Sequence, residues 1–137
     1  MTPGQFAIYL WIAAGGALGS VGRFALSGLV AERAGGASQW GTLFVNVSGS
    51  FLIGVLAAFA EPGGRRYISP NGRAFFMHGI CGGYTTFSSF SLETLKLMHE
   101  GDWLKAGANV VGSVVLCMVA VWLGYLFGLT LNNGKRV

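Results

Sequence analysis

The side chains of this sequence that can do chemistry are concentrated in residues 79–91, which read Gly-Ile-Cys-Gly-Gly-Tyr-Thr-Thr-Phe-Ser-Ser-Phe-Ser. The stretch lies in a long apolar region, yet Gly82 and Gly83 make it a poor regular helix because they loosen the backbone. Five hydroxyl side chains follow and can bond to backbone groups that a broken helix leaves free: Thr85, Thr86, Ser88, Ser89 and Ser91. We predict a membrane helix broken near residues 82–86, which is tolerated only inside protein or beside a water-filled path. A flexible packing surface of small residues is the alternative interpretation.

Two phenylalanines follow the predicted break. Phe87 and Phe90 are three positions apart, so they share one face of the helix that resumes there. The edge of a phenyl ring carries positive partial charge, and broken membrane helices often expose carbonyl and amide groups to ions. The pattern leaves two roles open, packing against lipid or core and lining an ion path.

Isolated polar side chains occur in two further apolar segments. Asn46 lies in the segment that begins at Trp40, and an amide in hydrocarbon must face protein or water because leaving it unpaired is costly. Asn109, Ser113 and Cys117 recur at steps of four and form a weakly polar stripe along another segment. Both features are compatible with helix packing or with a polar path through the protein.

A few ionisable residues fall within or beside the apolar segments. Arg23 lies in the second half of the first segment, where it either extends to the membrane interface or lies at a pore mouth. Glu93 follows the phenylalanine pair and is either an acid in a pore vestibule or an interfacial charge near Lys96. His78 and His99 have no metal or catalytic partner at helical spacing, so structural roles are predicted for both.

The composition predicts an all-α integral membrane protein. Of 137 residues, 53% are hydrophobic and 10% are charged, whereas soluble domains carry roughly 25% charged residues. A spanning helix needs about 20 residues, which leaves no room for a separate soluble domain. We predict that the whole chain forms a single membrane domain, residues 1–137, of four transmembrane helices, the third broken near its middle. The predicted spans are about 5–30, 40–60, 72–98 and 103–129.

Glycines at a four-residue spacing predict close contacts between helices. Gly15 and Gly19 lie in the first predicted span, and Gly124 and Gly128 lie in the last. Such pairs of small residues let two membrane helices approach closely. We therefore expect the first and last spans to pack tightly against neighbouring helices.

Four spans place both termini on the same side of the membrane. Positive charges are then divided between the terminal side (Arg65, Arg66, Arg73, Lys135 and Arg136) and the other side (Arg33, Lys96 and Lys105). Orientation follows the bias of Lys and Arg between the two sides, so this weak bias permits insertion in both orientations. Two oppositely inserted copies can pair antiparallel, and a bundle too small to enclose a pore alone also favours an oligomer.

Other classes of function lack the residues they need. The net charge of +4 is spread over loops, so we predict contact with anionic membrane lipid and no nucleic-acid partner. No acid and base fall at usable spacing within one span, so the chain is not predicted to be an enzyme. Cys81 and Cys117 match neither a disulfide framework nor a metal-binding spacing. The first apolar run has no Lys or Arg before it and is predicted to be a retained span.

Three motifs, taken together, resemble the Fluc, or CrcB, family of fluoride channels. Residues 82–91 read Gly-Gly-Tyr-Thr-Thr-Phe-Ser-Ser-Phe-Ser and resemble the signature of that family's third helix. Residues 41–49 read Gly-Thr-Leu-x-Val-Asn-x-x-Gly and resemble its second helix. Residues 15–23 read Gly-Gly-Ala-x-Gly-x-x-x-Arg and are similar to its first helix. The match spans the whole chain, and the combination is specific.

The resemblance implies an antiparallel, dual-topology homodimer in the cell (inner) membrane, with two pores that export fluoride passively and reduce its toxicity. It implies that Phe87 and Phe90 are the pore phenylalanines and Asn46 the pore amide. Thr86 and the polar-track Ser113 belong to the same pore by this resemblance. A hydroxyl or amide donor can replace part of the water that fluoride holds tightly, and phenyl edges can meet an anion. A narrow polar track would exclude chloride by size and donor geometry.

The resemblance also implies a cofactor and exposes two departures. One structural Na⁺ at the dimer interface would be held by the backbone carbonyls of Gly82 and Thr85 from both subunits. Arg23 matches the arginine of the family's first helix, which helps to draw anions to the vestibule. Cys117 stands where a threonine hydroxyl is often found, and Lys105 stands where a tyrosine is expected, so this end of the polar track departs from the family.

Two rival functions remain open on the residues alone. A small dual-topology multidrug transporter needs a membrane-embedded carboxylate for proton coupling. The first span has no acid before Glu32, and Glu93 lies near a helix end. A structural membrane subunit would explain the packing glycines, but it would not explain Asn46 and the two phenylalanines together.

Overall fold

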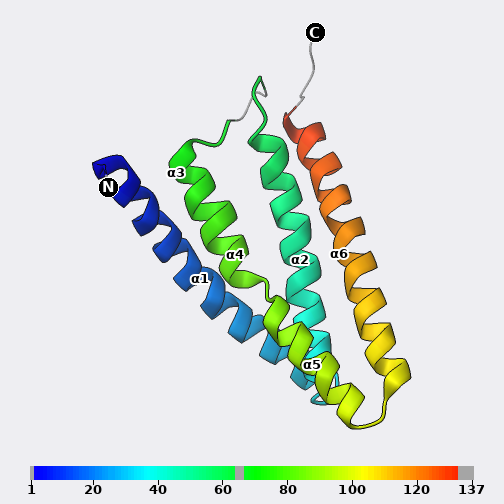
Figure 1. The fold of residues 1–137 in the computed structure, drawn as a ribbon. Helices are drawn as coiled ribbons and strands as arrows, with labels where there is room; N and C mark the ends of the chain where they lie inside the picture. Colours follow the sequence, from blue (N-terminus) through cyan, green and yellow to red (C-terminus); the bar gives the residue numbers. More distant parts are fainter. Residues whose placement is uncertain (1, 64–66, 133–137) are drawn as a thin grey trace.

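The computed structural model describes residues 2–63 and 67–132, and helices are the only regular structure in that part of the chain (Figure 1). Three continuous helices are long and apolar enough to cross a membrane: α1 (Pro3–Arg33), α2 (Ser38–Phe59) and α6 (Trp103–Asn132). The predicted all-α membrane class is therefore confirmed, and three of the spans have the length they need. The basic residues Arg65, Arg66, Lys135 and Arg136, which entered the charge comparison, lie outside the described residues.

The remaining predicted span, residues 72–98, is divided into four consecutive pieces. They are α3 (Pro70–Arg73), the π-helix η1 (Ala74–Cys81), α4 (Gly82–Tyr84) and α5 (Phe87–His99). None of the four pieces has the length of a span by itself. The π-helix was not predicted from the sequence; π-helices are rare and frequently occur at functional sites.

The ends of the helices follow local signals in the sequence. At the start of α1, the Gln5 N–H donates to Thr2 Oγ1 (3.3 Å) and the Thr2 N–H donates to Gln5 Oε1 (2.8 Å), which forms a capping box. After α1, Gly35 and Gly36 take positive φ angles of 77° and 85°, a conformation that favours glycine. Gly101 (φ 80°) does the same in the turn between α5 and α6.

The helices form two packed pairs that the interrupted segment connects. α1 lies along η1 and α4, and α2 lies along α6, while α5 continues from α4 and reaches the turn before α6 (Figure 1). The start of α1 and the end of α6 lie at the same end of the bundle (Figure 1). This arrangement places α2, α5 and α6 around one side of the interruption.

Close contacts at glycines hold both pairs together, as the sequence predicted. A Cβ atom added at Gly15 would lie 2.3 Å from the Phe75 carbonyl oxygen, and one added at Gly19 would lie 2.3 Å from the Ile80 carbonyl oxygen. In the other pair, a Cβ at Gly124 would lie 2.1 Å from the carbonyl oxygen of Phe51. Membrane helices approach this closely only where small residues meet, so these glycines set the spacing of the scaffold.

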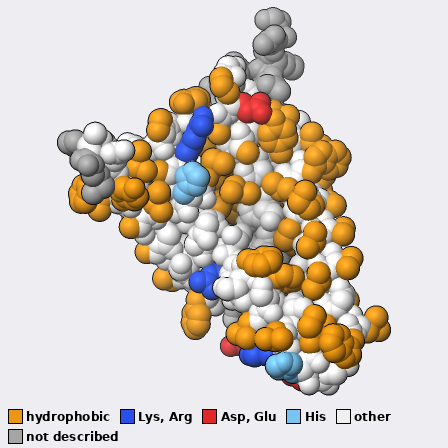
Figure 2. All heavy atoms as spheres, viewed as in Figure 1, with side chains coloured by type: hydrophobic (Ala, Val, Ile, Leu, Met, Phe, Trp, Pro, Cys, Tyr) orange, Lys and Arg blue, Asp and Glu red, His pale blue; other side chains and the backbone are white. Residues whose placement is uncertain are grey.

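Large hydrophobic side chains lie mostly on the outside of the molecule. Figure 2 shows them over most of one face, with few charged side chains among them. Phe24 is 83% exposed and Leu104 is 88% exposed, whereas the largest fully buried side chain among the described residues is only a valine, Val45. A soluble protein would not expose so much apolar surface, which agrees with the three helices that are long and apolar enough to cross a membrane.

The helical conformation is lost over a shorter stretch than the sequence predicted. Thr85 (φ −88°, ψ 158°) and Thr86 (φ −151°, ψ 116°) are extended, but Gly82 (φ −64°, ψ −37°) is helical. The prediction that the non-helical backbone begins at Gly82 is therefore wrong. Gly83 packs against α1, where a Cβ would lie 2.6 Å from the Gly16 carbonyl oxygen. The second glycine thus permits close packing, and two β-branched threonines carry the interruption.

Candidate functional site

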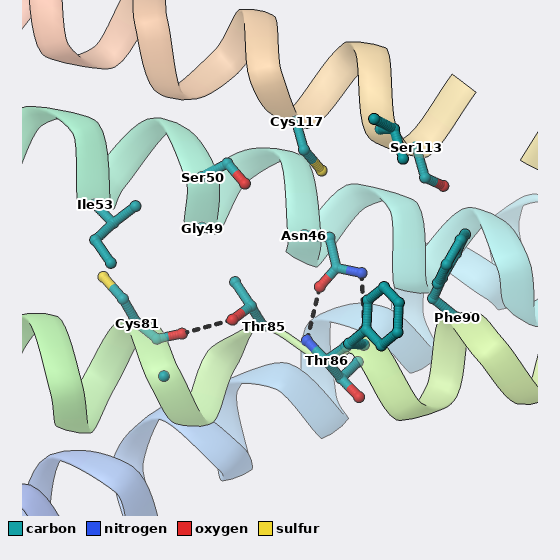
Figure 3. Close-up of a pocket in the computed structure, with 13 residues that line it drawn as sticks. Asn46, Gly49, Ser50, Ile53, Cys81, Thr85, Thr86, Phe90, Ser113 and Cys117 are labelled. Atoms are coloured by element: carbon teal, nitrogen blue, oxygen red, sulfur yellow. Dashed lines mark hydrogen bonds between the residues drawn. The ribbon is translucent and has the colours of Figure 1, made fainter. Parts of the chain in front are cut away.

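An open groove of about 320 Å³ lies beside the two extended threonines, between α2, the α4–α5 segment and α6 (Figure 3). It brings together residues that are far apart in the sequence. The predicted site residues that line it are Asn46, Gly82, Thr85, Thr86, Phe87, Phe90 and Ser113. Cys117 lines it as well. The groove therefore collects every predicted pore and carbonyl residue except Arg23.

Asn46 pairs with the interrupted backbone at Thr86. Its Nδ2 donates to the Thr86 carbonyl oxygen (3.0 Å), and the Thr86 N–H donates to Asn46 Oδ1 (2.7 Å) (Figure 3). The carboxamide thus replaces the helical partners that Thr86 lost, which meets the requirement that backbone groups at membrane depth be satisfied. A carboxamide nitrogen carries two N–H groups, so Asn46 has a second N–H to donate in addition to the one bound to Thr86.

The side chain of Thr86 caps the helix that follows. Its Oγ1 accepts from the Ser89 N–H (3.2 Å) and donates to Ser89 Oγ (3.1 Å). An N-cap of this kind starts α5 beside the groove. Because the first N–H groups of a helix have no intrahelical partner, the start of α5 has the positive end of a helix dipole facing this region.

The phenylalanine pair lies on the same groove. The Phe87 and Phe90 ring centroids are 5.3 Å apart, with 48° between the ring planes. Phe87 is 77% exposed, and Phe90 is half-buried. The Phe87 ring therefore projects from the surface of the helical bundle, while the Phe90 ring is partly packed against it.

α6 supplies the opposite wall of the groove. Ser113 is buried and Cys117 is half-buried, and both project from α6 toward the side of α2 that carries Asn46 (Figure 3). The predicted polar stripe of α6 thus faces the groove at these two positions. A hydroxyl is a good hydrogen-bond donor and a thiol is a weak one, so Ser113 can bind an anion more strongly than Cys117 can.

Two backbone carbonyls beside the groove have lost the partners that a continuous helix would provide. The Thr86 N–H donates to Asn46, whereas in a regular helix it would donate to the Gly82 carbonyl. The Thr85 carbonyl leaves the helical direction because its ψ angle is 158°. The described residues contain no group of three or more His, Cys, Asp or Glu side chains that could hold a metal.

Arg23 lies behind the interruption and does not line the groove. Its Nε donates to the Gly83 carbonyl oxygen (3.0 Å), which ties α1 to the end of α4. The side chain is half-buried. Its guanidinium therefore stabilises a carbonyl of the last helical turn before Thr85, and a role for Arg23 at a pore mouth stays a prediction.

A second polar cluster was only partly anticipated by the sequence. Thr42 Oγ1 donates to Glu93 Oε1 (2.7 Å), and Asn109 Nδ2 donates to Thr94 Oγ1 (2.9 Å). Glu93 Oε2 is buried and has no hydrogen-bond partner among the described residues. The partner found for Glu93 is thus Thr42, not Lys96. Thr42 lies one turn before Asn46 on α2, so the two polar side chains share a face of that helix, but this spacing does not identify Glu93 as the partner of Thr42.

Comparisons with known proteins identify the family of this chain. The family model described as CrcB-like protein, Camphor Resistance (CrcB), matches residues 10–125. The fluoride-specific ion channel FluC of Opitutus terrae is 61% identical over 128 residues, which are 93% of this chain and 97% of that protein. The FluC protein of Rhodospirillum rubrum is 56% identical over 92% of this chain and 98% of its own length. That of Methylocella silvestris is 50% identical over 93% of this chain and 97% of its own length.

Proposed function

Because this chain belongs to the CrcB family, we propose that it is a fluoride-selective ion channel that lets fluoride leave the cell passively. Export of this kind reduces the toxicity of fluoride. The relatives named as fluoride-specific channels match more than nine-tenths of the chain. The observation that carries the proposal is the groove, where the Asn46 amide, the Phe90 ring and the Ser113 hydroxyl face one cavity.

The chemistry of the groove suits a small anion with tightly held water. The second N–H of Asn46 and the hydroxyl of Ser113 are donors that can replace part of the hydration shell. Phe87 and Phe90 can present the positive edges of their rings to the anion. Chloride is larger and needs donors at a longer distance, so a narrow track with fixed donors favours fluoride.

The membrane arrangement belongs to the same proposal. Residues 70–99 cross the cell (inner) membrane as one interrupted helix, so that the chain has four spans and both termini lie on the same side. Two copies insert in opposite orientations and form an antiparallel homodimer with two pores. Two observations support this arrangement: the groove is open along one side, and the Phe87 ring is 77% exposed beside it. A second copy would enclose both.

A structural Na⁺ at the dimer interface fits the residues present. The carbonyls of Gly82 and Thr85 lack a helical donor, and Gly82 is exposed. Unwound carbonyls of this kind coordinate Na⁺ in other membrane proteins. Two carbonyls from one chain are too few ligands for a cation, so the ion requires both copies. When bound, Na⁺ would supply a positive charge that fixes the two interrupted segments against each other.

Fluoride efflux from liposomes tests the proposal directly. Purified protein is reconstituted into vesicles loaded with potassium fluoride, and efflux is started with a potassium ionophore and followed with a fluoride electrode. We expect rapid fluoride loss, and far slower loss from vesicles loaded with potassium chloride. Equal fluoride and chloride efflux would contradict a selective channel, and uptake of a cationic drug driven by a proton gradient would favour the transporter.

A further inference from the structure

A second cavity, of about 370 Å³, lies between the start of α2, the end of α5 and the first half of α6. Its polar lining consists of Gln39, Lys105, Asn109 and Ser113, with Trp40 among its apolar walls. Each of these four polar side chains carries a hydrogen-bond donor. The cavity is therefore lined by groups that can solvate an anion, although the walls between them are apolar.

The second cavity and the groove share one residue. Ser113 lines both, so the polar stripe of α6 continues from the groove toward the turn between α5 and α6. Asn109 lies one helical turn before Ser113, and Lys105 lies one turn before Asn109, so the three share a face of α6. The order along α6 is a cation, an amide and a hydroxyl, leading from the end of the bundle inward.

Lys105 is the cation in that series. Its Nζ lies 2.7 Å from Asp102 Oδ2, and the side chains are 65% and 42% exposed. Exposed ion pairs of this kind are weak and screened by salt. Asp102 therefore does not fully cancel the positive electrostatic potential that the Lys105 ammonium group creates at the mouth of the cavity. Asp102 opposes that field without lining the cavity.

We propose that the second cavity is an anion-collecting vestibule, in which Lys105 raises the local concentration of fluoride and Asp102 limits that effect. The inference rests on the proposed fluoride channel and adds to it the residues that set the supply of anions. It assigns a role to the lysine that departs from the family pattern. Charged clefts concentrate ions of opposite sign in this way, and salt removes the effect.

The size of the effect follows from simple electrostatics. One unit charge about 8 Å from an anion in water changes its local concentration by about twofold. The Debye length shortens from about 30 Å at 0.01 M salt to about 3 Å at 1 M. An electrostatic contribution of Lys105 to the fluoride efflux rate must therefore be measurable at low ionic strength and absent at high ionic strength. A role of Lys105 in packing would not depend on salt in this way.

The test compares initial fluoride efflux rates of four variants with the wild type in liposomes of neutral lipid, at about 0.01 M and about 1 M of an impermeant salt. K105Q should be about twofold slower than wild type at the low ionic strength and equal to it at the high one. K105R should match the wild type, because it keeps the charge. D102N should be faster at the low ionic strength only. K96Q is the matched control, since Lys96 lies on the other side of the same turn and does not line the cavity.

Three results would overturn the inference. They are a K105Q rate equal to wild type at low ionic strength, a K105Q defect of equal size at both ionic strengths, and a K105R rate as slow as that of K105Q. Elution of each variant as a dimer excludes a folding defect. If the wild type transported no fluoride, the result would contradict the proposed function and, with it, this inference. Active wild type with unchanged variants would overturn the vestibule alone.

Discussion

The packed pair of α2 and α6 and the interrupted segment beside it satisfy their backbone hydrogen-bonding groups in opposite ways. Between α2 and α6, each helix satisfies its own backbone, and glycines let the helices touch: a Cβ at Gly54 would lie 2.3 Å from the Val121 carbonyl oxygen. At Thr85 and Thr86 the backbone is not helical, and the Asn46 side chain satisfies the N–H and the carbonyl of Thr86. The first region is a rigid scaffold, and the second exposes polar groups that the scaffold holds in place.

The difference shows why the polar groups can persist at membrane depth. Asn46 reaches Thr86 from α2, and Arg23 reaches Gly83 from α1, so each side of the interruption is held by a different continuous helix. Close glycine contacts set the distances between these helices, so the site depends on the scaffold. A substitution in the site that leaves the glycine contacts intact therefore tests the site alone.

The largest expected effect is a loss of stability, caused by a large side chain at Gly124 in the contact between α2 and α6. We expect Gly124→Leu to prevent folding or to destabilise the protein by about 3 kcal/mol or more, because its side chain would overlap the backbone of α2 at Phe51. Thermal unfolding in detergent and elution as a dimer measure the effect. Gly107→Leu is the matched control on the same helix, since a Cβ there meets no atom within 4 Å. A wild-type melting temperature for Gly124→Leu would contradict the description of this contact.

The next effect should come from Asn46, in the site rather than the scaffold. Asn46→Asp keeps an acceptor for the Thr86 N–H but loses the donor to the Thr86 carbonyl and places a negative charge on the groove. We expect fluoride efflux to fall by more than about tenfold, since an unmet hydrogen bond alone costs about 1–3 kcal/mol. Asn71→Asp, on the exposed α3, is the control for the chemical change. Efflux within twofold of wild type would show that the Asn46 amide is not needed.

A narrower test replaces the phenyl rings without changing the scaffold. Phe87→Ile and Phe90→Ile should each reduce fluoride efflux sharply, because isoleucine is apolar but lacks the positive ring edge. The fold and the proposed dimer should survive, because apolar replacements of similar size usually cost less than about 1.5 kcal/mol. Phe76→Ile is a suitable control, as Phe76 is exposed on η1 and does not line the groove. Dimeric variants with wild-type efflux would show that the rings only pack.

The smallest effect should come from Cys117. We expect Cys117→Thr to raise fluoride efflux by about twofold or less, because a hydroxyl is a stronger donor than a thiol. Cys117→Ala, which has no donor, should not raise it. The comparison is made by the initial rates of both variants in the same vesicles. A gain for both variants would assign the effect to volume and not to hydrogen bonding.

The sequence predicted the scaffold better than the detailed geometry of the interruption. Helix limits at residues 3–33, 38–59 and 103–132 lie within three residues of the predicted spans, because glycine turns and apolar lengths are local signals. The predicted site residues that line the groove lie on α2, the α4–α5 segment and α6, and it was the resemblance to the CrcB family that implied them together; Ser50, Ile53 and Val114, which also line the groove, were not named. Their roles in carrying fluoride stay predictions.

What the sequence did not predict depends on contacts between distant segments. The π-helix at residues 74–81 and the helical Gly82 depend on how η1 and α4 pack against α1, which no local preference encodes. The Arg23–Gly83 and Thr42–Glu93 pairs depend on the register of two helices. An arginine or a threonine in an apolar helix indicates that a partner exists, but spacing alone does not identify it.

Blocking the groove chemically is the most direct test of the claim that fluoride passes through it. Protein with Cys81→Ala is labelled at Cys117 with a small methanethiosulfonate reagent, and full labelling is verified by mass before reconstitution. Because Cys117 lines the groove, labelled protein should lose nearly all fluoride efflux. Protein with both Cys81→Ala and Cys117→Ser, treated in the same way, should keep its efflux. Full efflux through labelled dimers would contradict the account, because the groove would then be filled while fluoride still passed.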